Sequence, residues 1–212
     1  MICVSLNITD VDQCIEALKS LEMAEIRIDL AGYNEQQVER VFSSHKNLIA
    51  TCRPDNITDE KRLKLLIRAI ESGAAFVDVE YESDLSFKHA VKQAIQNKNC
   101  KLIISFHDFK KTPTREQLEI IVQQCFDMGA DIAKLACMVN TDADNAALLS
   151  LYDSEKPVVS LGMGEKGKIS RIAAPLLGSP FTFAAFDEQS ATAPGQIQYK
   201  RLAELYSFIK NS

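Results

Sequence analysis

Short apolar runs rich in β-branched residues recur along the chain, and they alternate with longer segments whose apolar residues follow the periodicity of a helix. The runs predict eight strands, at residues 2–6, 25–30, 47–53, 75–81, 101–108, 131–138, 157–163 and 180–186. Two intervening segments, 59–73 and 114–130, are typical of amphipathic helices, and the second has Thr114 at its start and Gly129 near its end as capping residues. The pattern therefore predicts a strand followed by a helix, repeated eight times.

This repeat favours one fold, because a helix between two strands supplies the crossover that parallel strands need. Eight such units predict an α/β fold, a (β/α)8 TIM barrel, formed by residues 1–212 as a single catalytic domain. The chain is near the short end of the range for such barrels, about 200 to over 400 residues, so we expect no large inserted lid. An open, doubly wound sheet is the alternative, but no glycine-rich turn follows the first predicted strand.

Charged side chains alternate with apolar ones in several predicted strands. In the second strand Glu25, Arg27 and Asp29 fall on one face, and the apolar residues on the other face must pack against helices. The same alternation in the fifth strand turns His107 inward at its carboxyl end, where the active sites of these barrels lie. Lys134 turns inward on the next strand, at a similar predicted height. Polar chemistry is therefore expected inside the barrel mouth.

The two inward bases suit covalent chemistry on a carbonyl compound. Burial of the Lys134 ammonium would lower its pKa toward a neutral, nucleophilic amine, which can form a Schiff base. His107 titrates near neutrality and can take and return a proton. The alternative is structural: His107 as a satisfied core histidine, and Lys134 in an ion pair with Glu25, Asp29 or Glu80.

Composition limits the class of partner. The formal net charge of -5 provides no basic surface for nucleic acid or anionic membranes, so a small-molecule partner is expected. No leader sequence or membrane-spanning run is evident, which predicts a cytoplasmic protein. The six cysteines form no C-x-x-C pair and the three histidines are far apart, so neither disulfides nor a metal site is predicted.

A glycine-rich stretch at residues 162–168, GMGEKGK, almost completes the loop that cradles nucleotide phosphates. The next residue in that motif is a Ser or Thr that holds magnesium, but here it is Ile169, with Ser170 displaced by one position. The match fails at the metal ligand. A nucleotide site is therefore not predicted.

Five stretches together resemble type I 3-dehydroquinate dehydratases, Schiff-base TIM-barrel lyases of the shikimate pathway, which leads to the aromatic amino acids. They are EIRIDL from Glu25, ISFHDF from Ile104, AKLACM from Ala133, MGEKGKISR from Met163 and ATAPGQ from Ala191. The resemblance spans nearly the whole chain. It implies that Lys134 forms an imine with the ketone of 3-dehydroquinate and that His107 transfers the protons that lead to 3-dehydroshikimate. It also implies a homodimer and a reaction without any cofactor.

The resemblance further assigns residues to substrate binding. Arg171 would hold the substrate carboxylate and Met163 would lie against its ring, both in a mobile loop after the seventh strand that folds over the substrate. The other implied contacts are Glu25, Arg27 and Arg53 to hydroxyl groups, Phe183 beside the site, Gln196 closing it, and Ser5 and Thr192 as further hydrogen-bonding groups.

One segment departs from the family pattern. Family members usually carry a longer segment after the third-strand arginine, with an acid that orients the catalytic histidine, whereas here Arg53 is followed by Pro54-Asp55-Asn56-Ile57. Asp78, Glu80 and Asp55 are the candidates to orient His107.

Two other functions stay open: a class I aldolase acting on a small phosphorylated sugar, and a non-catalytic barrel that binds a shikimate-like metabolite as a regulator.

Overall fold

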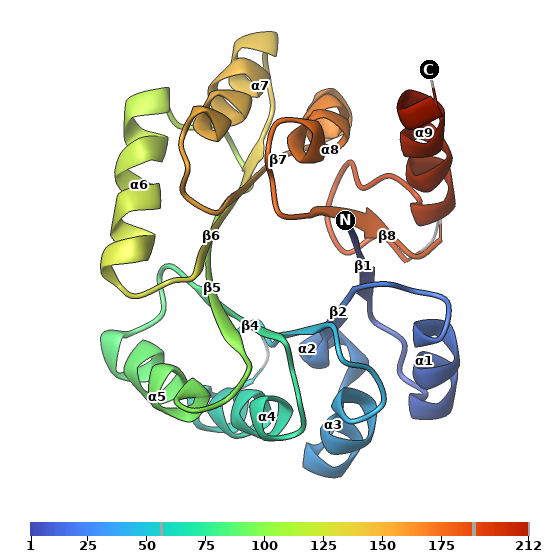
Figure 1. Ribbon diagram of the computed structural model, residues 1–212. Coiled ribbons are helices and arrows are strands. Elements are labelled where there is room, and N and C mark those ends of the chain that lie inside the picture. Colours follow the sequence, from blue (N-terminus) through green and yellow to red (C-terminus); the bar gives the residue numbers. More distant parts are fainter. Residues whose placement is uncertain (56, 188–189, 212) are drawn as a thin grey trace.

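Eight parallel strands form a ring at the centre of the computed structural model, with helices arranged around it (Figure 1). The structure describes residues 1–55, 57–187 and 190–211. The strands are β1 (Ile2–Leu6), β2 (Ala24–Arg27), β3 (Leu48–Thr51), β4 (Phe76–Glu80), β5 (Lys101–Asp108), β6 (Ile132–Met138), β7 (Val158–Met163) and β8 (Thr182–Ala185). Their order is β7-β6-β5-β4-β3-β2-β1-β8, so the predicted TIM barrel is confirmed.

Helices connect successive strands on the outside of the ring. They are α1 (Val11–Leu18), α2 (Ile28–Ala31), α3 (Glu35–Phe42), α4 (Asp59–Glu71), α5 (Leu85–Ile95), α6 (Arg115–Asp127), α7 (Asp142–Leu149), α8 (Lys168–Ala173) and α9 (Tyr199–Asn211), with 3-10 turns η1 (Ser150–Asp153), η2 (Glu165–Gly167) and η3 (Ala174–Leu176). Thr114 caps α6 through a bond from the Gln117 amide, and Gly129 follows its end with a φ of 93°, as predicted. Across the described residues, no helix is long and apolar enough to cross a membrane.

The second strand is shorter than the alternating pattern predicted. β2 ends at Arg27, and α2 begins at Ile28 and ends before Gly32, which has a φ of 69°. Ile28 still packs in the core and so continues the apolar period, although the backbone has left the sheet. Asp29 is therefore in a helix, where its carboxylate accepts bonds from Arg27 Nε (3.1 Å) and Nη2 (2.5 Å).

Two apolar layers fix the position of the strands. The outer layer, between strands and helices, holds Leu102, Ile104 and Leu135, which are the outward residues that alternation predicted. The inner layer fills the floor of the barrel with Cys3, Ile49, Ile103, Val159, Phe181 and Phe183, among others. Because this floor is packed with apolar side chains, polar groups can gather only above it, toward the carboxyl ends of the strands.

Candidate active site

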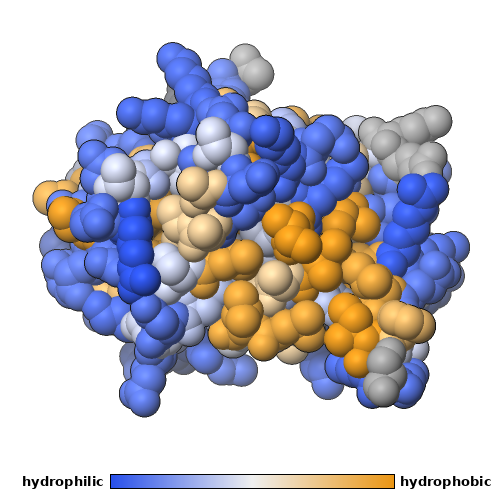
Figure 2. All heavy atoms as spheres, turned by 90° about the horizontal axis from the view of Figure 1, so that it is seen from above, coloured by the Kyte–Doolittle hydropathy of each residue, from blue (hydrophilic) through white to orange (hydrophobic). Residues whose placement is uncertain are grey.

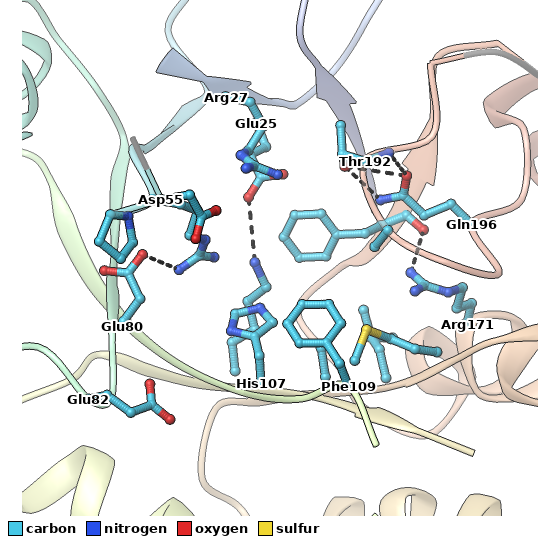
Figure 3. Close-up of a pocket in the computed structure, with 18 residues that line it drawn as sticks. Glu25, Arg27, Asp55, Glu80, Glu82, His107, Phe109, Arg171, Thr192 and Gln196 are labelled. Carbon is cyan, nitrogen blue, oxygen red and sulfur yellow. Dashed lines mark hydrogen bonds and ion pairs between the residues drawn. The ribbon is translucent and has the colours of Figure 1, made fainter. Parts of the chain in front are cut away.

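A cavity of about 410 Å³ opens at the carboxyl ends of the strands (Figure 3), a volume in the usual range for small-molecule sites. Glu25, His107 and Arg171 point into it from different sides. Ten of the predicted residues line it: Glu25, Arg27, Arg53, His107, Lys134, Met163, Arg171, Phe183, Thr192 and Gln196. The structure thus brings together side chains that the sequence separates by more than 150 positions.

Lys134 lies at the base of the cavity and is almost fully buried. Its Nζ is 2.9 Å from Asp78 Oδ2, 3.5 Å from Glu25 Oε1 and 4.2 Å from the centre of the Phe183 ring. The two carboxylates offset the cost of burying the ammonium. Of the ion pairs considered from the sequence, the one with Glu25 is present, while Asp29 and Glu80 bind arginines instead.

The two carboxylates around Lys134 are held in their charged forms. Burial alone would raise the pKa of Glu25, but Lys134, Arg27 and a bond from Ser5 Oγ (2.5 Å) lower it below the usual value. Burial likewise opposes ionisation of Asp78, and Arg53 and Lys134 more than compensate and lower its pKa strongly. The base of the cavity is therefore a charged, hydrogen-bonded layer.

His107 lies nearer the mouth than Lys134. In the ladder between β5 and β6, Lys134 pairs with Ser105 and His107 pairs with Ala136, so the two side chains of similar predicted height are offset by two residues along the strands. Burial, Arg53 and Lys134 lower the pKa of His107 well below its usual value, and Asp78 opposes them. The imidazole is therefore neutral near pH 7 and able to accept a proton.

The orientation of His107 does not come from a bound carboxylate. In the part of the chain that the structure describes, no side chain hydrogen-bonds to its imidazole; the ring is stacked on Phe109, with centroids 6.2 Å apart and planes 15° apart. Of the three acids considered, Asp78 acts on the imidazole through its charge, Glu80 binds arginine, and Asp55 is exposed at the mouth. Asn56, in the same shortened segment, lies outside the described residues.

Three arginines line the cavity, and they differ in their partners. Arg27 pairs with Asp29, and Arg53 lies 3.1 Å from Asp78 and 2.7 Å from Glu80. Arg171 is 2% exposed and has no carboxylate partner among the described residues.

Weak contacts leave the Arg171 guanidinium available. Its Nη1 and Nη2 are each 3.5 Å from a backbone carbonyl, of Phe183 and Pro194 respectively, and its buried Nε has no hydrogen-bond partner within the described ranges. Burial lowers the pKa of Arg171 to about 10, so it is still charged at pH 7. A buried cation without a counter-ion on a cavity wall is expected to receive an anionic ligand.

The segment after β7 is a 3-10 turn followed by a short helix, where a loop was predicted to carry both Met163 and Arg171. Met163 is the last residue of β7, and Arg171 belongs to α8. A Cβ added to Gly162 would lie 2.8 Å from Gly167 Cα, so these two glycines allow backbones to touch. Ser170 Oγ accepts a bond from the Gly162 amide (2.6 Å) and donates to the Gly167 carbonyl (2.7 Å). This packing places Arg171 on the cavity wall.

The segment after β8 covers the other side of the cavity. Gln196 Oε1 accepts a bond from the Thr192 amide (2.8 Å), and Thr192 Oγ1 bonds to Ser5 Oγ (2.8 Å). Ser5 is fully buried and does not line the cavity, unlike the other predicted residues; its hydroxyl supports Glu25 instead. The Gly164 amide donates to the Pro194 carbonyl at 3.2 Å, which joins the segments after β7 and β8.

Several residues at the cavity were not predicted from the sequence. They are Pro54, Glu82, Phe109, Ala136, Leu161 and Ala193. Phe109 and Ala136 belong to the stretches that carried the family resemblance, and each is two residues beyond a predicted inward side chain, so alternation could have indicated them. Across the described ranges, no three His, Cys, Asp or Glu side chains are grouped as metal ligands would be.

A buried lysine amine below a neutral histidine, at the carboxyl end of a (β/α)8 barrel, defines the class of Schiff-base barrel enzymes. Comparison with known proteins specifies the family. The model of the type I 3-dehydroquinase family matches residues 2–212, and this chain belongs to that family.

Curated relatives and solved structures agree with this membership. The 3-dehydroquinate dehydratase of Methanocaldococcus jannaschii is 38% identical over 99% of this chain and 99% of its own, and that of Methanococcus maripaludis is 34% identical over 99% and 100%. A crystal structure of type I 3-dehydroquinate dehydratase from Clostridium difficile, with covalently modified comenic acid, has a TM-score of 0.86, 27% identity, and coverage of 99% of this chain and 92% of that one.

Proposed function

We propose that this chain is a 3-dehydroquinate dehydratase, a hydro-lyase of the shikimate pathway that forms 3-dehydroshikimate and water through an imine on Lys134. One observation carries the proposal: the Lys134 amine, the neutral His107 and Arg171, which has no carboxylate partner among the described residues, share one cavity. Residues 1–212 would act as one catalytic domain. A cytoplasmic location is supported by the six cysteines, which are all buried free thiols.

The reaction begins at the base of the cavity. The Lys134 nitrogen, once deprotonated, attacks the ketone carbon of 3-dehydroquinate, and loss of water gives an iminium ion. Its positive charge withdraws electrons from the adjacent carbon, which makes the C–H bond there acidic. Asp78 and Glu25, both ionised and within 3.5 Å of Nζ, stabilise this positive charge as they stabilise the free ammonium.

Proton transfer then falls to His107. Its neutral imidazole removes the proton from the adjacent carbon and returns one to the hydroxyl group that departs as water. The elimination forms the carbon–carbon double bond, and hydrolysis of the iminium releases 3-dehydroshikimate and restores Lys134. The position of His107 above Lys134, nearer the mouth, suits a base that acts on a carbon next to the imine.

The remaining side chains would hold the substrate in position. Arg171 would bind the carboxylate, and Met163 and Phe183 would pack against the ring. Glu25, Arg27, Arg53, Thr192 and Gln196 would contact hydroxyl groups, whereas Ser5 would act indirectly through Glu25 and Thr192.

The two other functions considered from the sequence are not favoured. The family match covers almost the whole chain, and its curated relatives bear the name of the dehydratase rather than of an aldolase. Solved structures of 3-hexulose-6-phosphate synthases share the barrel at a TM-score of 0.62, but at 16% identity or less they reveal the fold alone. A purely regulatory role would leave the Lys134 and His107 arrangement without a purpose.

Borohydride trapping tests the proposed reaction. The protein is mixed with 3-dehydroquinate and borohydride, intact mass is measured, and enone absorbance is followed in parallel without borohydride. We expect a reduced adduct that peptide mapping places on Lys134, while Lys88, also buried but hydrogen-bonded to backbone carbonyls of Tyr81 and Ser83, stays unmodified. Enone without an adduct would refute the covalent mechanism, and absence of both would refute the function.

Arg171→Met is expected to raise KM far more than it lowers kcat. The guanidinium has no carboxylate partner in the described chain and is therefore available to the substrate carboxylate. Its removal would leave that carboxylate buried without a cation. Loss of one partner of such a buried pair costs about 2–5 kcal/mol, or roughly 30- to several thousand-fold in kcat/KM. Steady-state kinetics measure the split. Arg171→Lys, which keeps the charge but not the planar fork, should recover part of the loss; an unchanged KM in Arg171→Met would contradict this role.

We further propose a homodimer formed by one apolar face. Figure 2 shows apolar side chains gathered over α8, η3 and α9. The exposed members are Ile169, Leu176, Leu177, Phe208 and Ile209. Large exposed apolar patches mark interaction surfaces on soluble proteins, and each partner in a stable dimer buries roughly 800 Å², so five large apolar side chains on one face favour such an interface. A groove along α9, of about 490 Å³, shares Leu176 with this patch.

Sedimentation measures the oligomeric state directly. Phe208, the most exposed member of the patch at 72%, can be changed to Asp with little effect on the fold of one chain. We expect a dimer for the unmodified protein and a shift toward monomer for Phe208→Asp. Ile120→Asp, on the exposed side of α6 and outside the patch, is the matched control. A monomeric unmodified protein, or a dimer that Phe208→Asp leaves intact, would refute the interface.

A further inference from the structure

A buried arginine outside the cavity, Arg62, binds two groups that fix the position of Arg53, the Cys52 carbonyl and the Glu80 carboxylate. Arg62 occupies the first turn of α4 and is only 2% exposed. The other buried residues of that helix are Leu65, Leu66, Ala69 and Ile70, so Arg62 takes a position in the apolar stripe. Its guanidinium lies 4.7 Å from the centre of the Phe87 ring, which faces it from α5. Burying a cation among apolar side chains costs free energy unless the cation is paired and hydrogen-bonded, so the partners of Arg62 explain its position.

Two contacts of Arg62 act on the two ends of Arg53. Arg62 Nε donates to the carbonyl of Cys52 at 2.9 Å, and that carbonyl belongs to the peptide bond preceding Arg53. Arg62 Nη2 binds Glu80 Oε2, while the other oxygen, Glu80 Oε1, accepts from Arg53 Nη1 at 2.7 Å. One guanidinium thus constrains both the backbone and the side chain of its neighbour.

The result is an Arg53 side chain with one end fixed and one end free. Its Nη1 meets Glu80 Oε1 (2.7 Å), Ser105 Oγ (3.0 Å) and Asp78 Oδ1 (3.1 Å). Among the described residues, Nε and Nη2 of Arg53 have no hydrogen-bond partner, and the residue lines the cavity. The free nitrogens can therefore bind a polar group of the substrate, at a position set by Nη1.

We propose that Arg62 is a positioning residue that aligns Arg53 for the substrate through Glu80 and the Cys52 carbonyl. The chain between Arg53 and α4 is short here, and the first turn of α4 supplies this support directly behind the cavity. The inference rests on the proposed dehydratase function, because Arg53 is taken to bind 3-dehydroquinate. Arg62 itself is not among the residues that line the cavity, so it is expected to act on the substrate only through Arg53.

Kinetics of three variants test the role of Arg62. Arg62→Met should raise KM for 3-dehydroquinate about tenfold and change kcat little, because it loosens a binding group and leaves Lys134 and His107 in place. Arg62→Lys should recover part of this loss. Asp59→Asn is the matched control, since Asp59 binds Arg62 Nη1 (2.6 Å) on the exposed side and touches neither Glu80 nor Arg53; its KM should stay near that of the unmodified enzyme.

A double-mutant cycle separates positioning from general stability. If Arg62 acts through Arg53, Arg62→Met should add nothing to the KM of Arg53→Met, whereas a merely structural effect would add in both backgrounds. Glu80→Gln, which keeps the shape but breaks the charge link between the two arginines, should reproduce the KM rise and serves if Arg62→Met does not fold. An unchanged KM or an additive effect overturns the inference. Failure of the unmodified enzyme to form enone would instead overturn the proposed function.

Discussion

Replacing Lys134 with methionine is expected to abolish turnover, with kcat falling by about 10⁴ to 10⁶, the range seen when one member of a catalytic group of residues is removed. The substrate could still occupy the cavity, because Arg171 and the hydroxyl contacts are unchanged. No imine could form, so neither the reduced adduct nor the enone should appear. Intact mass after borohydride treatment and enone absorbance measure the two losses.

Lys134→Arg distinguishes loss of chemistry from loss of structure. The Lys134 ammonium offsets the charges of Asp78 and Glu25, so Lys134→Met leaves these buried carboxylates with less compensation and should lower the thermal midpoint. The guanidinium in Lys134→Arg keeps the positive charge and should preserve more of that stability, yet it cannot form the imine. Turnover by a folded Lys134→Arg protein would contradict the assignment of Lys134 as the nucleophile.

Replacing His107 with asparagine has the second largest expected effect, a fall of about 10² to 10⁴ in kcat, the usual contribution of a general acid–base group. Unlike the Lys134 variants, this protein should still form a trappable imine, because the amine is intact. Borohydride trapping at saturating substrate is the measurement. Equal loss of adduct and enone in His107→Asn would mean that His107 acts on imine formation rather than on the elimination.

The pH dependence of the unmodified enzyme follows from the same histidine. Burial and the charges of Arg53 and Lys134 lower the pKa of His107 well below its usual value, so the basic, neutral form persists when the pH falls below about 6.5. The acid limb of kcat/KM, which reports the free enzyme, should therefore be centred below pH 6.5. A limb centred at or above that pH would show that the imidazole is not held neutral by these neighbours.

The repeat of strands and helices predicted the fold, and alternation along the strands turned His107 and Lys134 toward the inside of the barrel. Leu102, Ile104 and Leu135 pack in the outer core as expected, and this places His107 and Lys134 on the inner face. The pattern failed at the second strand, since Ile28 keeps an apolar contact after the backbone has turned into a helix. The period of apolar residues reports which side chains are buried, and Ile28 stays buried although it belongs to a helix, so the period alone does not reveal where the strand ends.

Other features depend on register and on distant contacts. The different heights of Lys134 and His107 follow from the ladder between β5 and β6, which no single strand encodes. The weak contacts of Arg171 are made with the backbone carbonyls of Phe183 and Pro194, whose positions beside it depend on the packing of β8 and the segment after it. Arg62 left a clearer signal, because a charged residue within the apolar stripe of a helix requires a buried partner.

The charged layer at the base of the cavity also affects how such a protein can change over generations. Six neighbouring strands, β1 to β6, each contribute one polar side chain to it: Ser5, Glu25, Thr51, Asp78, Ser105 and Lys134. Each is a partner of at least one other, so a single replacement leaves a buried group unsatisfied. Substitutions here are therefore strongly epistatic, and inheritance should preserve the layer as a unit or exchange several members together.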